Sequence, residues 1–382
     1  MLGWEFPPLI NGGLGVACHG LAHALAEKIP LTLLLPLNQS PPGFASLSLP
    51  ENPSTHPFSP TLPVPTDLTP YLDAAPSKQT TLYGPDLAAQ VLDFTRRAAD
   101  AAARHSFDLI HAHDWMTALA GLEIRARTGK PLIFHVHSLT YDRAGLQDRG
   151  WIYEIEKSVL READLVVAVS RYTRKIAIEN YAADPLKTVV VHNGTPLLRA
   201  YRSPKPFPEK LVLFLGRLTS QKGPDHFLEI ARLVLAENDQ VRFAVAGTGE
   251  QLRSLMSTAR RFGIERALHF TGFLNRKKVR HLLSMADAYC MPSNSEPFGL
   301  SALEAAQFGL PVVLSQESGV AEVLPQARAA PATDPAALAQ HLLDALAQDR
   351  PKIPQQFRSW QDAATELLKH YRTLADDQKS QA

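Results

Sequence analysis

Apolar runs of strand length alternate with amphipathic segments along the first half of the chain. The apolar runs predict buried strands at residues 31–35, 109–111, 132–136, 165–169 and 188–191. The segments between them carry apolar positions at helical spacing and predict helices at residues 17–27, 88–104, 117–127 and 153–162. Strands that alternate with helices are typical of βαβ units, which pair their strands in a parallel sheet. The first half therefore predicts an α/β domain.

The second half repeats this pattern after a proline-rich stretch, which indicates a linker at residues 199–210. Strands are predicted at residues 211–215, 241–246, 268–271, 288–291 and 312–314. A chain of 382 residues is long enough to form two separate cores. We expect one domain at residues 1–198, a second at 211–352, and an amphipathic helix within 353–382.

Two regions near the start depart from this regular pattern. Only Met1, Leu2 and Gly3 precede Trp4, whereas a strand before a glycine loop usually has about five or six residues. Either the true start lies upstream of Met1 or the first strand is a stub. Prolines recur through residues 36–76, which predicts a surface loop with extended pieces rather than a helix or a central strand.

Composition excludes several classes of function. The chain has 39 Lys and Arg against 38 Asp and Glu, so neither nucleic acid nor an anionic membrane is an expected partner. Cys18 and Cys290 lie in apolar contexts and are expected to be reduced packing residues. No apolar stretch reaches the roughly 18 residues of a membrane helix, so we expect a cytoplasmic protein without a membrane span. Nothing in the sequence indicates an oligomeric state.

Residues 293–304 combine two carboxylates with a glycine and a helix start. Glu296 precedes the predicted helix, and Glu304 lies in its second turn. The backbone N–H groups of Phe298, Gly299, Leu300 and Ser301 are then the free donors of a helix N-terminus, which is a ready anion site. One carboxylate on each side of an anion site suits a sugar nucleotide, in which a diphosphate joins a sugar to a ribose.

Further candidates follow the strands of the second half. Arg217 and Lys222 come after the strand at 211–215 and could neutralise a diphosphate, because ligands of open α/β sheets bind at the carboxyl ends of strands. Gly247 closes the next strand, and Phe273 and Leu274 follow another. All three could enclose the nucleobase and ribose, although Phe273 fits a core position equally well.

The glycine loop at the start of the first helix is a second candidate for binding phosphate. Gly12 and Gly13 allow backbone donors to approach an anion closely. The loop lacks the third glycine of the dinucleotide-binding fingerprint, which argues against a nicotinamide oxidoreductase.

Histidines follow two strands of the first half. His111 and His113 stand two apart beside Asp114 and could chelate a metal, but no further ligand follows at metal spacing, so no metal site is predicted. We expect His111 in the core. By strand alternation His135 and His137 share a face, and only His137 is expected to reach the ligand. Beyond them, residues 141–143 are candidates for the acceptor side.

Taken in this order, these motifs resemble the retaining GT-B glycosyltransferases of the family 4 type, in the glycogen and starch synthase-like branch. The resemblance rests on the Gly-Arg-Leu-Thr-x-x-Lys-Gly run at 216–223, the spaced glutamates, the triplet 113–115 and His137. It implies two Rossmann-like, doubly wound parallel-sheet domains that face a central cleft, with a last helix that crosses back to the first domain. Ile10 departs from the pattern, because glycogen synthases that use ADP-glucose usually have a lysine there.

The resemblance also implies roles for the candidate residues. Glu296 would hold sugar hydroxyls, Glu304 the ribose, and His137 and Asp114 would orient sugar and acceptor, with Trp115 lining the same side. Arg217 and Lys222 would replace a metal cation, so no cofactor is expected beyond the substrate, ADP-glucose or UDP-glucose. No residue is an obvious nucleophile, so the expected mechanism is attack from the face of the leaving diphosphate.

The expected function is transfer of a hexosyl unit, with glucose the expected sugar, to a hydroxyl acceptor such as an α-glucan. Glucose 1-phosphate or a lipid or small metabolite would also fit as acceptor. Two other functions stay open. A nucleotide-sugar 2-epimerase could use the same scaffold, although the acid–base pair that it needs is not evident. A non-catalytic carbohydrate-sensing protein could retain a degenerate site.

Overall fold

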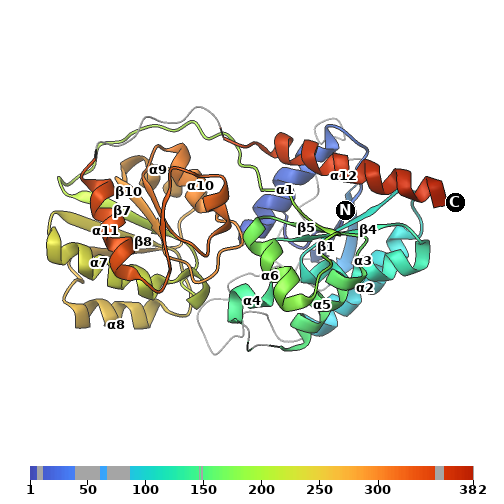
Figure 1. The fold of residues 1–382 in the computed structure, drawn as a ribbon, viewed down its shortest axis with the longest axis horizontal. Coiled ribbons are helices and arrows are strands. Elements are labelled where there is room, and N and C mark those ends of the chain that lie inside the picture. The colour runs from blue at the N-terminus through green and yellow to red at the C-terminus, as the bar shows by residue number, and fades with distance from the viewer. Residues whose placement is uncertain are drawn as a thin grey trace.

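The computed structural model describes residues 1–6, 12–38, 61–66, 87–145, 147, 149–348 and 357–381, with only the backbone described at 37–38, 61–66 and 377–381. Figure 1 shows two lobes side by side, each with a central sheet between helices. Ile10 and most of the proline-rich stretch lie outside the described residues. Of the described helices, none combines the length and apolar content that a membrane crossing requires.

The sheet of the first lobe is parallel throughout. Its strands are β1 (Leu33–Asn38), β2 (Thr61–Thr66), β3 (Ile110–His113), β4 (Leu132–Val136), β5 (Leu165–Ala168) and β6 (Thr188–Val190). β1 pairs with β2, and β3 to β6 pair in chain order. Leu2 forms single parallel bridges to Leu34 and Ala112, so it joins β1 to β3. A one-residue stub thus occupies the centre of this sheet.

The helices of the first lobe cover both faces of its sheet. They are α1 (Gly13–Ala26), α2 (Leu87–Ala102), α3 (Trp115–Thr128), α4 (Thr140–Ala144), α5 (Trp151–Glu162) and α6 (Arg171–Tyr181). Successive residues of a strand point to opposite faces. Phe134 therefore packs with Phe94 of α2 in one core, while Ile133 packs with Leu21 of α1 in another.

The second lobe contains one six-stranded parallel sheet. Its strands are β7 (Lys210–Leu215), β8 (Val241–Ala246), β9 (Leu268–Gly272), β10 (Ala288–Met291), β11 (Val312–Ser315) and β12 (Arg328–Ala330). Their spatial order is β12-β11-β10-β7-β8-β9. The strand order reverses between β7 and β10, and such a switch point is where doubly wound sheets bind ligands. The first lobe reverses in the same way between Leu2 and β3.

Helices also cover both faces of this second sheet. They are α7 (Pro224–Glu237), α8 (Leu252–Phe262), α9 (Arg276–Met285), α10 (Leu300–Gln307) and α11 (Pro335–Leu346), with short 3₁₀ turns at Ser220–Lys222 and Gly319–Glu322. Phe214 packs with Phe227 of α7 in one core, and Leu213 packs with Ala302 of α10 in the other.

The last helix, α12 (Trp360–Gln381), lies on the first lobe. Figure 1 shows it in red beside α1, after the chain has crossed back from the second lobe. Trp360 and Leu367 join Leu21 in one apolar cluster, and a β-carbon on Gly20 would lie 2.4 Å from the Trp360 ring. Any larger residue than glycine at position 20 would therefore push α12 away from α1.

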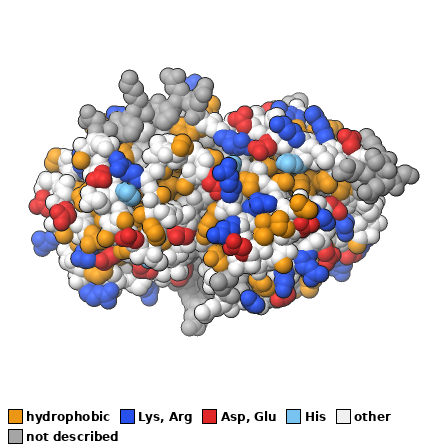
Figure 2. Space-filling model, in the orientation of Figure 1, with side chains coloured by type: hydrophobic (Ala, Val, Ile, Leu, Met, Phe, Trp, Pro, Cys, Tyr) orange, Lys and Arg blue, Asp and Glu red, His pale blue; other side chains and the backbone are white. Residues whose placement is uncertain are grey.

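Cys18 and Cys290 are both buried and form no disulfide, as predicted, and Cys290 packs in an apolar core. On the face shown in Figure 2, basic and acidic side chains are interspersed, which is consistent with the nearly equal numbers of the two kinds.

Candidate active site

The two switch points lie close to each other across the lobes. A β-carbon placed on Gly13, at the start of α1, would lie 3.9 Å from Leu300 Cδ1, at the start of α10. Leu300 packs against apolar clusters of both lobes. The N-termini of two helices thus converge. Since each N-terminus carries partial positive charge, their meeting point favours an anion.

The backbone N–H groups at the start of α10 are free to bind such an anion. Gly299 has a φ of 108°, and its carbonyl accepts the N–H groups of Ala302 and Leu303. Within the described part of the chain, no acceptor is bonded to the N–H groups of residues 298–301. The predicted donors at Phe298, Gly299, Leu300 and Ser301 are therefore present, whereas the Phe298 side chain is buried in the core.

Lys222 and Glu296 form an ion pair at the carboxyl ends of β7 and β10. The Glu296 side chain is 6% exposed and that of Lys222 is 21% exposed. The backbone of Glu296 is fixed because its N–H donates to the Glu317 carbonyl at 2.8 Å and its carbonyl accepts the N–H of Gly319 at 2.9 Å. Two residues predicted separately for diphosphate and sugar thus form an ion pair with each other.

Arg217 precedes Lys222 in the turn after β7, and its side chain makes little contact with the described residues. Its side chain is exposed, and among the described residues its hydrogen bond is a long one of 3.4 Å from Nη2 to Gln221 Oε1. The backbone carbonyl of Gln221 accepts the N–H of Asn294 at 2.9 Å, which ties the turn after β7 to the loop after β10. The guanidinium is therefore held near Lys222 but left available to an anion.

Close backbone contact explains the glycine at position 247. Gly247 has a φ of 145°, and a β-carbon on it would lie 1.9 Å from the Gly216 carbonyl oxygen. Only glycine fits there. Phe273 is 77% exposed, which excludes the core alternative for it, whereas Leu274 packs against the core beside α9 and α10.

Glu304 lies in the field of a positive charge, that of Arg276, which the sequence did not single out. Burial raises the pKa of the Glu304 carboxyl, and the positive charge of Arg276 opposes that rise. The pKa of His19, on α1, is lowered to about 4 by burial first, then by His23 and Arg276. Arg276 at the start of α9 therefore acts on groups of both lobes. In the sequence, this role of Arg276 is indicated only by its position a few residues after the end of β9.

Asp114 follows β3 in a strained conformation, with a φ of 56°. Its Oδ1 accepts the backbone N–H groups of His137 at 2.6 Å and Ser138 at 3.2 Å. Burial raises the pKa of Asp114 to about 7. The carboxyl group thus fixes the chain after β4, and through it the position of His137, rather than projecting freely toward a ligand.

The histidines form a stack that runs from the core to the site. His137 Nε2 lies 2.8 Å from His113 Nδ1, and burial lowers the pKa of His137 to about 3, so its ring is neutral. Deeper in the stack, His111 contacts His135 at 3.2 Å and the hydroxyl of Tyr371 at 2.5 Å. These contacts confirm His111 as a core residue.

One residue that the resemblance placed on the acceptor side does not lie there. The Trp115 side chain is 1% exposed and packs edge-on against Trp151. Its position at the start of α3 turns the indole into the apolar core of the first lobe, where its large apolar surface is most stabilising.

The loops beyond the histidines join the lobes instead of lying in solvent. Ser295 Oγ donates to Asp142 Oδ1 at 2.5 Å and lies 3.0 Å from the Tyr172 hydroxyl. Ser170 Oγ donates to the Pro297 carbonyl at 2.6 Å. Burial raises the pKa of Asp142 to about 6. These contacts place the loop that carries Glu296 directly against the first lobe.

Comparison with known proteins gives a consistent result. Residues 11–199 match the family model described as Glycosyltransferase Family 4, and residues 200–361 match Glycosyl transferases group 1. The glycogen synthase of Mycobacterium tuberculosis is 29% identical over 97% of this chain and 93% of its own. The fold resembles sucrose-phosphate synthase of Thermosynechococcus elongatus, with a TM-score of 0.68, 22% identity and coverage of 99% and 94%. It also resembles the catalytic domain of starch synthase IV from Arabidopsis thaliana, bound to ADP and acarbose, with a TM-score of 0.64, 15% identity and coverage of 98% and 98%.

Proposed function

Because the chain belongs to the family 4 glycosyltransferases and has the GT-B fold, we propose that it transfers glucose to an α-glucan. The proposed donor is ADP-glucose or UDP-glucose, and the proposed outcome is retention of the anomeric configuration. The similarity to a glycogen synthase along nearly the whole chain supports the glucan acceptor. We also propose that the protein is cytoplasmic.

One observation carries this proposal, namely the ion pair between Lys222 and Glu296 beside Arg217 and two helix N-termini. A diphosphate bound there competes with Glu296 for the Lys222 ammonium. As Lys222 turns to the phosphate, the Glu296 carboxylate is released to accept hydroxyl groups of the sugar. The Lys222 ammonium and the Glu296 carboxylate thus neutralise each other before the donor binds, and each binds one part of the donor afterwards.

The proposed reaction is attack on the same face as the departing diphosphate. The acceptor oxygen bonds to the anomeric carbon, the bond from that carbon to the phosphate oxygen breaks, and the acceptor proton passes to that phosphate oxygen. Retaining hydrolases use a carboxylate nucleophile instead. Here Glu296 is paired with Lys222, and Asp114 is held by backbone N–H groups.

Charge stabilisation then comes from the protein itself. Arg217 and Lys222 neutralise the leaving diphosphate, so the proposed reaction needs no divalent cation. The neutral His137 ring serves as a hydrogen-bonding group for the sugar, and Asp114 holds it in position through the backbone. Glu304 is the proposed partner of the ribose hydroxyls.

Nucleotide release from a panel of ADP-, UDP- and GDP-sugars, with and without maltooligosaccharide, tests this function. Release that requires the glucan, from one glucose donor, is the expected result. Conversion of the donor to its epimer without any acceptor would show a 2-epimerase instead. Binding of donor without turnover of any sugar nucleotide would show a sensing protein.

A further inference from the structure

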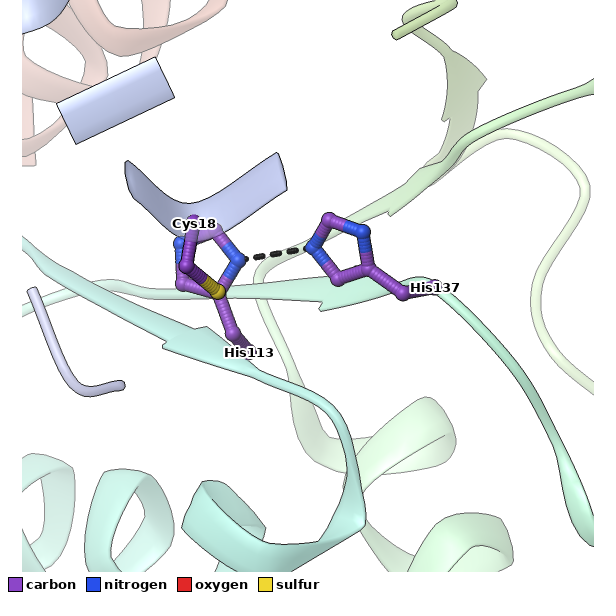
Figure 3. Close-up of side chains that lie close together, drawn as sticks. All are labelled: Cys18, His113 and His137. Atoms are coloured by element: carbon purple, nitrogen blue, oxygen red, sulfur yellow. Dashed lines mark hydrogen bonds between the residues drawn. The ribbon is translucent and has the colours of Figure 1, made fainter. Parts of the chain in front are cut away.

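A thiol and two imidazoles lie close together in the first lobe (Figure 3). Cys18 comes from α1, His113 ends β3, and His137 follows β4. One ligand atom of each residue lies within 4.8 Å of the ligand atoms of the other two. Three separate elements of the first lobe thus aim sulfur and nitrogen atoms at one point.

These groups are buried, and one of them lacks a partner. Cys18 and His113 are 0% exposed, and His113 Nε2 has no hydrogen-bond partner among the described residues. A buried polar atom without a partner is rare and calls for an explanation.

We propose that Cys18, His113 and His137 bind a thiophilic divalent cation, with Zn²⁺ as the best match. One thiolate and two neutral imidazoles are ligands that Zn²⁺ prefers, and three protein ligands leave a fourth tetrahedral position open. On binding, the Cys18 thiol releases its proton to solvent as the sulfur–zinc bond forms. The hydrogen bond between His113 and His137 breaks, and each ring ligates through one nitrogen.

The ligand atoms need to shift only slightly to fit the geometry of zinc. Zinc bonds of about 2.3 Å to sulfur and about 2.0 Å to nitrogen place tetrahedral ligand atoms roughly 3.3–3.6 Å apart. Atoms that lie within 4.8 Å of one another are at most about 1 Å too far apart for such a site, whereas His113 Nδ1 and His137 Nε2, at 2.8 Å, would have to separate by about half an ångström.

A second triad, His111, His113 and His135, is equally close, but it is a poorer site. His111 and His135 are each 1% exposed, and His111 already binds the Tyr371 hydroxyl and His135. The Cys18 triad ends at His137, which is 9% exposed and thus more accessible than His111 or His135. It also has the only sulfur ligand of the two groups.

The site predicts an effect on activity. An ion on His137 removes the imidazole that we place at the transferred sugar, so zinc should inhibit transfer. This consequence rests on the proposed function, whereas the binding itself does not.

Direct binding is therefore measured first, on the full chain with Co²⁺ and Zn²⁺. Cobalt should bind with one equivalent and give a thiolate charge-transfer absorbance, which Zn²⁺ then displaces. Cys18→Ser should abolish that absorbance and weaken Zn²⁺ binding by at least about tenfold. Cys290→Ser is the matched control, because Cys290 is equally buried but lies in β10 of the second lobe. Cys18→Ala repeats the test should the serine variant fail to fold.

Absence of the charge-transfer absorbance in the wild type, or its retention in a folded Cys18 variant, overturns the proposal. Where the wild type transfers sugar, Zn²⁺ should inhibit it reversibly and EDTA should restore it. The Cys18 variant should resist inhibition while the Cys290 variant does not. A protein that binds cobalt through Cys18 but transfers no sugar would keep this site and refute the proposed function alone.

Discussion

Removal of the Lys222 ammonium should separate the structural role of the Lys222–Glu296 pair from its proposed role in transfer. Lys222→Met keeps the length and apolar stem of the side chain but leaves Glu296, 6% exposed, without its ion-pair partner. Breaking a buried pair costs about 3–5 kcal/mol, and the partial exposure of Lys222 reduces our expectation to about 2–3 kcal/mol of unfolding free energy. Urea unfolding at neutral pH measures this loss.

The loss of activity should have a different pattern. Glu296→Gln added to Lys222→Met removes the unpaired charge, so the double variant should recover about 1–3 kcal/mol of stability. It should recover no transfer, because the diphosphate still lacks its ammonium. We expect both variants to turn over at least about a hundredfold more slowly than wild type, equivalent to about 3 kcal/mol.

A matched control is the ion pair between Lys205 and Asp287. It is similarly buried, with side chains 16% and 20% exposed, but Asp287 precedes β10 and so lies at the opposite edge of the sheet from the site. Lys205→Met should lose comparable stability and keep transfer. Equal losses of transfer in Lys205→Met and Lys222→Met, or near-normal transfer in Lys222→Met, would refute the reasoning.

Four other predictions follow from single residues. Arg217→Ala should cost about 3–4 kcal/mol of transition-state stabilisation, seen as a lower kcat; near-normal turnover contradicts its role. Glu304→Ala should chiefly raise KM for the donor, and an unchanged KM would leave Glu304 only structural. Gly247→Ala should destabilise the fold by about 3 kcal/mol or more in thermal unfolding, because its β-carbon would meet the Gly216 carbonyl. Since burial raises the pKa of Asp114 from 3.8 to about 7, the folded state binds more protons in that window, and stability falls as pH rises through it. In urea unfolding, Asp114→Asn should remove up to about 4 kcal/mol of that fall; the same pH dependence in both proteins would contradict the assignment.

The strands were predicted well, because the apolar run that marks a strand is a local feature of the sequence. All the predicted strands are present, three of them (132–136, 241–246 and 288–291) with the predicted ends, since an apolar run bounded by turn residues needs little outside information. β2 was missed as a strand because it contains Pro63 and Pro65. Among the described strands it pairs with β1 alone, so the missing proline N–H groups cost little. Helix α1 begins at Gly13, earlier than predicted, because glycines conceal a helix start.

The sequence predicted which residues belong to the site, but not which of them contact each other. Strand ends and a helix start mark Arg217, Lys222 and Glu296 in the sequence. Their pairing could not be predicted, because Lys222 and Glu296 are 74 residues apart and meet only at a switch point between strands. The bond between Asp142 and Ser295 depends on how two lobes dock, which no local pattern encodes.

Transfer of labelled glucose from ADP-glucose or UDP-glucose into glycogen tests the central claim most directly. The product should contain new α-linked glucose, seen by the anomeric proton signal and by digestion with an α-specific glucanase. Label in a β linkage would contradict retention. Label that never enters glucan, with any glucose donor and a folded protein, would contradict the proposed acceptor.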